Sequence, residues 1–321
     1  RGLLQLETVL NGDWPIDSGP SWLASHVLAG RRVLAVSGTH GKTTTSSLLV
    51  WILKYAGLDP GYLIGGMPQF SKVSAELGSS PWFVLEADEY DSAFFDKRAK
   101  FLQVHPQGII LNNLEFDHAD IYKNLKEIQA AFKCWMRTLP SEGLLVCPTK
   151  MPSISSISNI AAQWSQVASL HHADAWHIRA ESDHFDAVSW WFGSVHMGAF
   201  SGAWLCEHLA HNALAAAVLA HRCVGVSADV ISSALNEFPG VKRRMECIGR
   251  SGDRVMYDDF AHHPTAIDKT LQAIVKRHPD QPVLVCLELG AYTLKQQSQC
   301  SALVAALSLA DQVFLIRPEQ H

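Results

Sequence analysis

The stretch Val33-Leu-Ala-Val-Ser-Gly-Thr-His-Gly-Lys-Thr-Thr-Thr45 joins an apolar, β-branched run to a glycine loop that ends in Lys-Thr. It predicts a buried strand that ends at Val36, a tight turn through Gly38 and Gly41, and a helix that begins near Thr43. Such a turn directs several backbone N–H groups and a helix N-terminus at one anion. We therefore interpret this stretch as a phosphate-binding loop.

The side chains of the loop support this interpretation. Lys42 supplies a mobile positive charge for the β- and γ-phosphates of a nucleotide, and the Thr43 hydroxyl is a ligand for Mg²⁺. The full pattern G-x-x-x-x-G-K-[ST] is not met, because Val36 stands where its first glycine belongs. An ordinary strand-to-helix turn is the alternative, although Gly-Lys-Thr rarely follows a strand and opens a helix by chance. The residues expected to contact ATP here are Gly38, Thr39, His40, Gly41, Lys42, Thr43 and Thr44.

Composition limits the possible classes of protein. The 321 residues, 48% of them hydrophobic, are enough for more than one domain. A net charge of −5 argues against a protein that binds nucleic acid or a membrane surface. The seven cysteines show no CxxC pair or zinc-type spacing, which is typical of reduced thiols in a cytosolic protein. The chain begins at Arg1 rather than Met and ends just after a predicted strand, so both ends look cut.

Strands and helices alternate along the first half of the chain, which predicts a parallel sheet that binds ligands at the carboxyl ends of its strands. Residues 151–166 are serine-rich and weakly patterned, and residues 171–197 alternate like the antiparallel strands of a smaller sheet. We expect strands at 62–64, 82–87, 107–111 and 143–148, and helices at 2–10, 21–28, 43–56, 123–138, 208–225 and 229–238.

A second alternating pattern follows a hinge-like segment at 238–245. It consists of predicted strands at 255–258 and 283–288 and predicted helices at 264–278 and 301–309, which is the start of a doubly wound domain. The predicted fold is thus α/β, with a central P-loop-type parallel-sheet ATPase domain, a flanking smaller sheet and an incomplete Rossmann-like C-terminal domain.

The segment Glu86-Ala-Asp-Glu-Tyr-Asp91 places four carboxylates within six residues, directly after an apolar strand. So many acids repel one another unless a cation is present. Beside a phosphate loop the expected cation is Mg²⁺, which prefers oxygen ligands. A solvated acidic loop is the alternative for Asp88, Glu89 and Asp91, whereas Glu86 comes first after the strand and is the best ligand candidate.

A second polar cluster, Leu111-Asn-Asn-Leu-Glu-Phe-Asp-His-Ala-Asp-Ile-Tyr122, also follows a strand. Its His118 is a candidate metal ligand or proton carrier, although a lone histidine is more often structural. Together with the two preceding loops, this cluster favours an ATP site that holds two cations.

A third cluster, Tyr257-Asp-Asp-Phe-Ala-His-His-Pro-Thr265, follows a strand of the C-terminal domain. Pro264 near a helix start and the paired histidines indicate a functional loop, with core or capping histidines as the alternative. Closure of the two domains would bring this loop to the phosphates, and the basic hinge Lys242-Arg243-Arg244 would meet them as well.

These motifs resemble the Mur ligase family of ATP-dependent amide-forming ligases over essentially the whole chain. The recycling branch of that family is the most similar in its acidic and His-His-Pro segments. The resemblance rests on Gly38-Thr-His-Gly-Lys-Thr-Thr-Thr45, Glu86-Ala-Asp-Glu89, Asn113 with Asp117-His118, His211-Asn-Ala-Leu-Ala215, Arg243-Arg244, and Asp258-Asp259 with His262-His263-Pro264.

The resemblance implies three domains. Residues 1–30 would be the last portion of a UDP-sugar-binding domain that is mostly absent, 31–239 the central ATP-binding domain, and 240–321 part of a C-terminal Rossmann-like domain. It also implies roles for individual residues. Thr43 and Glu86 would hold one Mg²⁺ and His118 a second, Asn113 would lie beside the nucleotide, Asn212 would contact adenine, and Arg244, Asp259 and His262 would arrive with the closing domain.

Lys133 is a further candidate, because several members of this family carry at this position a lysine carbamylated by CO₂ that helps to hold the second cation. The alternative is a solvated helix lysine, since the apolar stripe of Ile128, Phe132 and Trp135 leaves Lys133 off the buried face.

The implied reaction converts a carboxylate into an acyl phosphate with ATP, and an amine then attacks the acyl phosphate. The acid would be the lactyl carboxylate of UDP-N-acetylmuramate and the amine that of a recycled murein tripeptide. Lys42, Arg244 and the cations would stabilise the transferring phosphoryl group, and His118 or His262 would take the amine proton. Alternatives are a ligase that adds L-alanine alone, a folylpolyglutamate-type ligase, or a non-catalytic nucleotide-binding module. Within Glu288–Leu294 an arginine common in relatives is missing, which leaves the acceptor peptide open.

Overall fold

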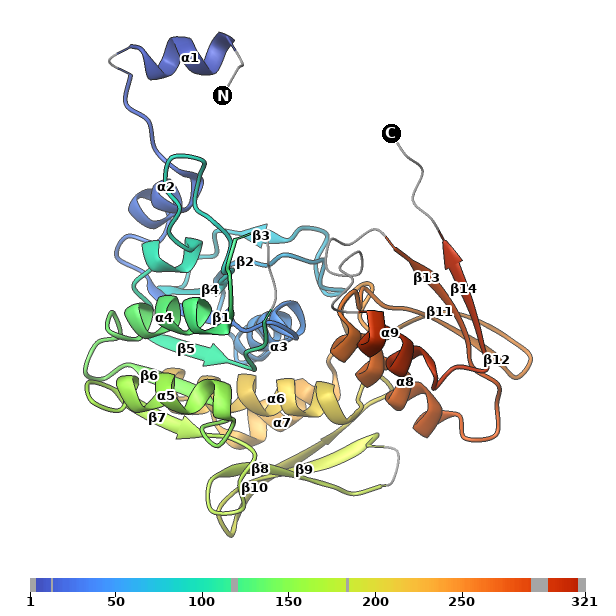
Figure 1. The fold of residues 1–321 in the computed structure, drawn as a ribbon. Helices are drawn as coiled ribbons and strands as arrows, with labels where there is room; N and C mark the ends of the chain where they lie inside the picture. The colour runs from blue at the N-terminus through green and yellow to red at the C-terminus, as the bar shows by residue number, and fades with distance from the viewer. Residues whose placement is uncertain (1–3, 13, 117–120, 183–184, 290–299, 317–321) are drawn as a thin grey trace.

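The computed structural model describes residues 4–12, 14–116, 121–182, 185–289 and 300–316 (Figure 1). Its largest element is a seven-stranded sheet of order β3-β2-β4-β1-β5-β6-β7, in which only the β2–β3 pair is antiparallel. The predicted parallel sheet is thereby confirmed. The strands are β1 (Arg32–Ser37), β2 (Gly61–Leu63), β3 (Ala75–Glu76), β4 (Trp82–Glu86), β5 (Gly108–Leu111), β6 (Leu144–Cys147) and β7 (Gln166–Ser169).

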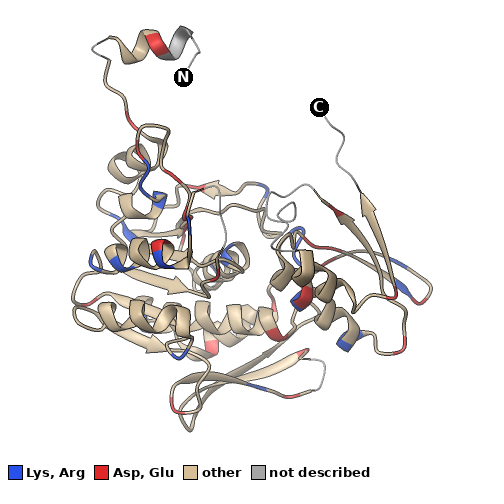
Figure 2. Ribbon diagram, in the orientation of Figure 1, with Lys and Arg blue, Asp and Glu red and all other residues tan. Residues whose placement is uncertain are grey.

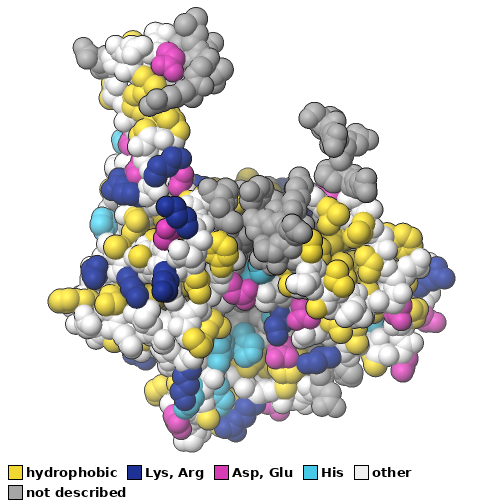
Figure 3. Space-filling view, in the orientation of Figure 1, with side chains coloured by type: hydrophobic (Ala, Val, Ile, Leu, Met, Phe, Trp, Pro, Cys, Tyr) yellow, Lys and Arg dark blue, Asp and Glu magenta, His cyan; other side chains and the backbone are white. Residues whose placement is uncertain are grey.

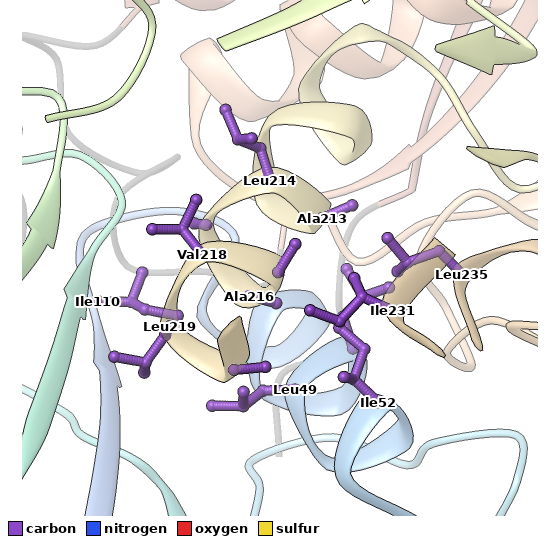
Figure 4. Close-up of a cluster of buried hydrophobic side chains, with 14 of the residues drawn as sticks. Leu49, Ile52, Ile110, Ala213, Leu214, Ala216, Val218, Leu219, Ile231 and Leu235 are labelled. Atoms are coloured by element: carbon purple, nitrogen blue, oxygen red, sulfur yellow. The ribbon is translucent and has the colours of Figure 1, made fainter. Parts of the chain in front are cut away.

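Both faces of this sheet are covered by helices, because its strands are apolar on both sides. Ile110 of β5 joins a core with α3 (Lys42–Tyr55), α6 (Glu207–Leu219) and α7 (Ala228–Asn236), as Figure 4 shows. Ile109 and Leu111 point to the other face, where they pack with α4 (Leu125–Met136) and α5 (Pro152–Ala161). Each fully buried Leu or Ile contributes on the order of 2 kcal/mol to stability. The carboxyl end of β1, which carries the phosphate loop, is therefore rigidly held.

Helix α5 is an element that the sequence analysis missed, since serines lower helix propensity and hid its pattern. Pro152 at the first turn favours the helix start. Ile154, Ile157 and Ala161 follow at spacings of three and four residues and are fully buried. Packing against the sheet thus outweighs the weak intrinsic preference of this segment.

The predicted antiparallel sheet is confirmed and consists of β8 (Trp176–Ala180), β9 (Ala187–Phe192) and β10 (Val195–Ser201). Trp176 and Trp190 stack with their ring centroids 5.9 Å apart. The Trp190 indole N–H donates to Ser232 Oγ of α7 at 3.2 Å. The small sheet is therefore anchored to the helical layer of the central part.

The C-terminal part contains β11 (Glu246–Ser251), β12 (Arg254–Asp258), α8 (Pro264–Arg277), β13 (Leu284–Glu288), α9 (Cys300–Leu307) and β14 (Gln312–Ile316). The β13–β14 pair is parallel, as a doubly wound domain requires, whereas β11 and β12 form an antiparallel hairpin. Strand β11 was not predicted from the sequence, because its largely exposed residues show no apolar alternation. The domain boundaries proposed from the sequence stay a prediction.

The C-terminal part packs against the end of the central part at which α6 begins (Figure 1). Apolar contacts there join Cys206 and Leu209 to Met245 and Ala273. Lys276 of α8 also pairs with Glu207 of α6 at 3.1 Å, at a junction where Figure 2 shows acidic and basic residues side by side. The C-terminal part is therefore held close to the phosphate loop.

The remaining described elements are α1 (Leu4–Leu10), which stands apart from the body in Figure 1, α2 (Gly19–His26), η1 (Lys100–Gln103) and η2 (Ala220–Val224). Helix α6 thus ends earlier than the predicted 208–225, because it passes into the wider turn of η2. Within the described ranges, no helix is both long enough and apolar enough to cross a membrane.

Candidate active site

The loop between β1 and α3 has the backbone geometry of a phosphate cradle. Gly38 and Gly41 adopt φ values of +131° and +80°, which favour glycine. A Cβ on Gly38 would lie 2.9 Å from the Asn113 carbonyl oxygen, and one on Gly41 would lie 2.7 Å from Asn212 Oδ1. Gly41 is the N-cap residue of α3 and has no side chain with which to cap the helix. The first N–H groups of α3 are therefore left for a ligand.

The end of β5 braces this loop. The His40 N–H donates to Asn113 Oδ1 at 2.8 Å, and Asn113 Nδ2 donates back to the His40 carbonyl oxygen at 3.1 Å. Asn112 Nδ2 donates to Thr45 Oγ1 in the first turn of α3 at 2.9 Å. Asn113 thus fixes the shape of the phosphate loop, while its expected place beside the nucleotide stays a prediction.

We predict that Gly41→Ala weakens ATP binding roughly tenfold or more, because the added methyl group strains a left-handed residue and collides with Asn212. Gly57→Ala is the matched control, because Gly57 also has positive φ, at +78°, but has open space around its missing Cβ. Titration calorimetry with ATP measures both. Equal affinity of the two variants for ATP would contradict the assignment of the cradle.

Lys42 lies among the acids that follow β4. Its Nζ is 3.1 Å from Glu89 Oε2 and 3.5 Å from Asp88 Oδ1. Burial alone would lower the pKa of Lys42, but these carboxylates outweigh it and raise the pKa above the usual value. Burial also raises the pKa of Asp88. The structure therefore brings the phosphate loop and the acidic segment together, with a permanent positive charge between them.

Thr43 and Glu86 meet at the opening of the loop. The Thr43 hydroxyl donates to Glu86 Oε1 at 3.0 Å, and the Gly65 N–H holds the other carboxylate oxygen at 2.7 Å. A hydroxyl and a carboxylate this close, beside a phosphate cradle, fit the oxygen preference of Mg²⁺. Arg244 reaches the same place from the C-terminal part, since its Nη2 donates to Thr43 Oγ1 at 3.3 Å.

The second polar cluster is only partly described. His118 and Asp117 lie outside the described residues, so the proposed second metal ligand and its role in proton transfer stay predictions. Glu115 is described, and its backbone N–H donates to Thr39 Oγ1 of the phosphate loop at 2.9 Å. Tyr122 donates its hydroxyl to the Glu89 carbonyl oxygen at 2.8 Å. The described residues of this cluster therefore contact both the phosphate loop and the acidic segment that follows β4.

The C-terminal loop meets the phosphate loop through His263, whereas the residue singled out from the sequence was its neighbour His262. The His263 ring is buried and lies 4.6 Å from that of His40, centroid to centroid. His262 instead packs on Phe260, and its Nδ1 lies 2.9 Å from the Phe260 carbonyl oxygen. The signal was present in the sequence, because a residue directly before a Pro that opens a helix is the N-cap and faces the helix start.

Asp259 is half-buried and accepts hydrogen bonds from the Met245 and Ala261 N–H groups at 2.7 and 2.8 Å. Burial raises the pKa of Asp259, although these two bonds act against that shift. Burial likewise lowers the pKa of Arg244, while Asp259 and Glu86 oppose that shift. Asp259 thus shapes the hinge that presents Arg244 to Thr43, and it also lines the neighbouring cavity.

A cavity of about 320 Å³ lies between the phosphate loop, α6 and the start of α8. Asn212 of α6 lines it, as do His171 and His211, whose ring centroids are 4.2 Å apart. Histidines gather on this face where the central and C-terminal parts meet (Figure 3). Burial lowers the pKa of His211 and lowers that of the neighbouring His208 to about 4. This part of the wall is therefore polar but uncharged at neutral pH, which suits a nucleotide base.

A buried ring nitrogen of His211 lies in this wall of the cavity. The buried Nδ1 of His211 makes no hydrogen bond within the part of the chain that the structure describes. A buried polar atom of this kind costs free energy unless a ligand or water satisfies it. The atom therefore supports a polar ligand in this cavity.

Lys133 lies on α4 and is half-buried, off the stripe formed by Ile128, Phe132, Trp135 and Met136. This agrees with the helix position expected from the sequence. Its carbamylation and its place in a metal site stay predictions.

A glycine loop between a parallel strand and a helix, acids at the next strand end and a C-terminal part docked on the loop define a P-loop-type enzyme that uses a nucleotide. Residues 36–220 match the Mur ligase middle domain, and residues 243–321 match the Mur ligase glutamate ligase domain. The chain belongs to the Mur ligase family, whose members are ATP-dependent amide ligases, so the resemblance expected from the motifs is confirmed.

Individual relatives agree with this assignment. The chain is 41% identical, over its full length and 70% of the relative, to UDP-N-acetylmuramate–L-alanyl-γ-D-glutamyl-meso-2,6-diaminoheptanedioate ligase of Haemophilus influenzae. It is 31% identical, over 82% of this chain and 56% of the relative, to UDP-N-acetylmuramate–L-alanine ligase of Syntrophomonas wolfei. The crystal structure of a murein peptide ligase from Psychrobacter arcticus matches with a TM-score of 0.75 and 36% identity, over 98% of this chain and 69% of that one.

Proposed function

We propose that this protein joins the lactyl carboxylate of UDP-N-acetylmuramate to the amine of L-alanyl-γ-D-glutamyl-meso-diaminopimelate, with ATP, in the recycling of peptidoglycan. The observation that carries the proposal is the 41% identity to the Haemophilus influenzae ligase, which extends across the whole chain and includes the phosphate loop. The Thr43–Glu86 contact at the opening of that loop supports the ATP chemistry.

The reaction needs activation, because a carboxylate is a poor electrophile toward an amine. Transfer of the γ-phosphoryl group of ATP to the lactyl carboxylate gives an acyl phosphate. The peptide amine then attacks the acyl carbon, the C–O bond to phosphate breaks, and the amine loses a proton. The products are the amide, ADP and inorganic phosphate.

Different residues of this chain would have different roles in this reaction. We infer that the backbone of the loop from Gly38 to Thr44 cradles the phosphates, and that Lys42 leaves Glu89 and Asp88 to contact the γ-phosphate. Thr43 and Glu86 would hold Mg²⁺, which when bound neutralises charge on the transferring phosphoryl group. Arg244 stands within hydrogen-bonding distance of Thr43 and would add a second protein cation. The same proposal includes His118 as a ligand of a second Mg²⁺.

The base of the nucleotide would occupy the cavity beside the loop, where Asn212 and His211 offer uncharged hydrogen-bonding groups. Asp259 would act on the hinge that carries Arg244. His262 remains the candidate for taking the amine proton in the C-terminal loop, although its ring packs on Phe260. A cytosolic location, expected from the cysteines, belongs to the proposal as well.

The experiment that tests the substrate is a product assay with the full-length protein. UDP-N-acetylmuramate, ATP and Mg²⁺ are incubated with the tripeptide or with L-alanine, and mass spectrometry detects the amide. We expect the tripeptide adduct. An L-alanine adduct alone would favour the runner-up, the activity named for the Syntrophomonas wolfei relative. ATP binding without any amide, and without phosphate release stimulated by an acceptor, would favour a non-catalytic nucleotide module.

We predict that Glu86→Gln raises the Mg²⁺ concentration for half-maximal ligation about tenfold, because a neutral amide is a far weaker ligand for a hard cation. The Gln oxygen still accepts from the Gly65 N–H and its NH₂ group can donate to the Thr43 hydroxyl oxygen, so the loop should stay in place. Initial rates measured over a Mg²⁺ series at saturating ATP give the value. An unchanged Mg²⁺ dependence would assign the cation to other ligands.

A further inference from the structure

One group of metal-ligating side chains lies outside the proposed Mg²⁺ site. Among the described residues, His40, Glu115 and His263 form a group in which one ligand atom from each lies within 4.8 Å of the others. His40 Nε2 is 3.5 Å from Glu115 Oε2, and His263 Nδ1 is 3.9 Å from the same oxygen. Two imidazoles and one carboxylate are the ligand set of many zinc sites with an open fourth position.

The surroundings hold these three side chains in place. His40 belongs to the phosphate loop, and its backbone is fixed at both N–H and C=O by Asn113. Glu115 is tied to the same loop through Thr39. The Thr265 hydroxyl donates to Glu115 Oε2 at 2.8 Å, which orients the carboxylate as an outer-shell partner does in metal sites.

The third ligand comes from the C-terminal part. His263 Nδ1 accepts a hydrogen bond from the Thr265 N–H at 3.3 Å. This hydrogen bond is long, so breaking it costs little free energy. The side chains of His40 and His263 are 18% and 7% exposed, whereas that of Glu115 is 38% exposed. An ion at this place would thus have two shielded imidazole ligands and one side open toward the cavity that Glu115 lines.

We propose that His40, Glu115 and His263 bind a zinc-class divalent cation, distinct from the Mg²⁺ that accompanies ATP. Zinc-ligand bonds of about 2.0–2.2 Å place tetrahedral ligands about 3.4 Å apart. Because the three ligand atoms lie within 4.8 Å of one another, no pair of them has to close by more than about 1.4 Å to complete the site. Imidazole selects zinc, cobalt or nickel over magnesium.

A consequence follows from the origin of the ligands. His40 and Glu115 belong to the central part, whereas His263 belongs to the C-terminal part, so one ion would join the two. Turnover requires the two parts to separate and close again, so the bound ion would slow ligation by locking them together. The site would therefore be inhibitory, and it is independent of which acceptor the ligase uses.

Cobalt(II) is the probe, because tetrahedral Co²⁺ with nitrogen ligands absorbs visible light and Mg²⁺ does not. The protein is titrated with Co²⁺ in excess Mg²⁺, without nucleotide. Glu115→Gln keeps the acceptor for Thr265, and His263→Asn keeps a side chain that caps α8. Each should weaken Co²⁺ binding by about 100-fold. His262→Asn removes the adjacent imidazole, which packs on Phe260, and should bind Co²⁺ like the parent.

Amide hydrogen exchange is the second measurement, and it tests whether the bound ion joins the central and C-terminal parts or affects only the residues around it. Zn²⁺ should slow amide hydrogen exchange both in the phosphate loop and in the first turn of α8, in the parent and in His262→Asn but not in His263→Asn. Circular dichroism verifies that each variant is folded. Equal Co²⁺ affinity in the parent, Glu115→Gln and His263→Asn would overturn the proposal, as would the absence of saturable Co²⁺ absorption in the parent.

Discussion

Lys42→Ala is expected to reduce ligation by roughly 10³-fold or more, which makes it the largest effect that we predict. The γ-phosphoryl group gains charge in the transition state, and Lys42 is the cation that the loop itself supplies. Its Nζ already lies in a nest of carboxylates, which would repel the phosphates if the ammonium were missing. Initial rates of amide formation at saturating ATP and Mg²⁺ measure the loss.

Two controls separate this chemical role from a structural one. Lys54→Ala removes a lysine of the same helix that pairs with Glu76 at 2.6 Å, and it should keep ligation near the parent rate. In the double variant Lys42→Ala with Glu89→Gln, removal of a buried carboxylate should recover stability but not ligation. Turnover close to the parent rate in Lys42→Ala would contradict the assignment of the ATP site.

Acid is expected to destabilise the protein through His208, by about 2 kcal/mol between pH 7.5 and pH 5. Burial lowers the pKa of His208 to about 4 from an ordinary 6.5, and Lys269 acts in the same direction. Its place in the first turn of α6 adds to the cost of a positive charge there. The folded state therefore keeps this imidazole neutral.

The sign of the effect follows from proton uptake. Below pH 6.5 the unfolded chain protonates His208 and the folded chain does not, so stability falls as the pH falls. The contribution of His208 is complete above pH 6.5 and is lost between pH 6.5 and about 4. The raised pKa of Asp259 acts in the opposite direction, because a neutral carboxyl group is favoured in the folded state. Comparison of variants is therefore needed to isolate His208.

Urea unfolding at the two pH values provides that comparison. His208→Asn should lose about 2 kcal/mol less than the parent between pH 7.5 and pH 5, because it no longer takes up a proton on unfolding. His172→Asn is the control, because its partner Asp174 is 91% exposed, and this variant should follow the parent. The same pH dependence in His208→Asn and the parent would show that other groups cause the acid sensitivity.

The phosphate loop could be predicted because its signal is local. The β-branched run before Gly38, the glycines with positive φ and the Lys-Thr at the start of α3 all lie within about a dozen residues. Elements with a strong apolar pattern were predicted for the same reason. Helix α5 and strand β11 were not, because their serines or exposed residues carry little intrinsic preference, and packing or pairing with distant strands decided their structure.

The site could be predicted only in part from the sequence, because it depends on contacts between distant segments. The sequence pointed to paired histidines after β12, but it did not show that His263, rather than His262, faces His40 across the junction. Glu115 was quoted only as part of a cluster, and its contacts with Thr265 and His40 depend on how the two parts dock. Sequence patterns report periodicity within one element and carry no information on such docking.

By itself the sequence determined the class of chemistry, because a phosphate cradle and acids at strand ends are made from neighbouring residues whose backbone geometry is local. Only the tertiary structure decided which side chains share the cradle. Arg244 reaches Thr43 from 201 positions along the chain, and Asn212 closes against Gly41 from α6. These contacts depend on how the helical layers and the junction between the two parts are packed. Such packing is a property of the whole folded chain rather than of any one segment.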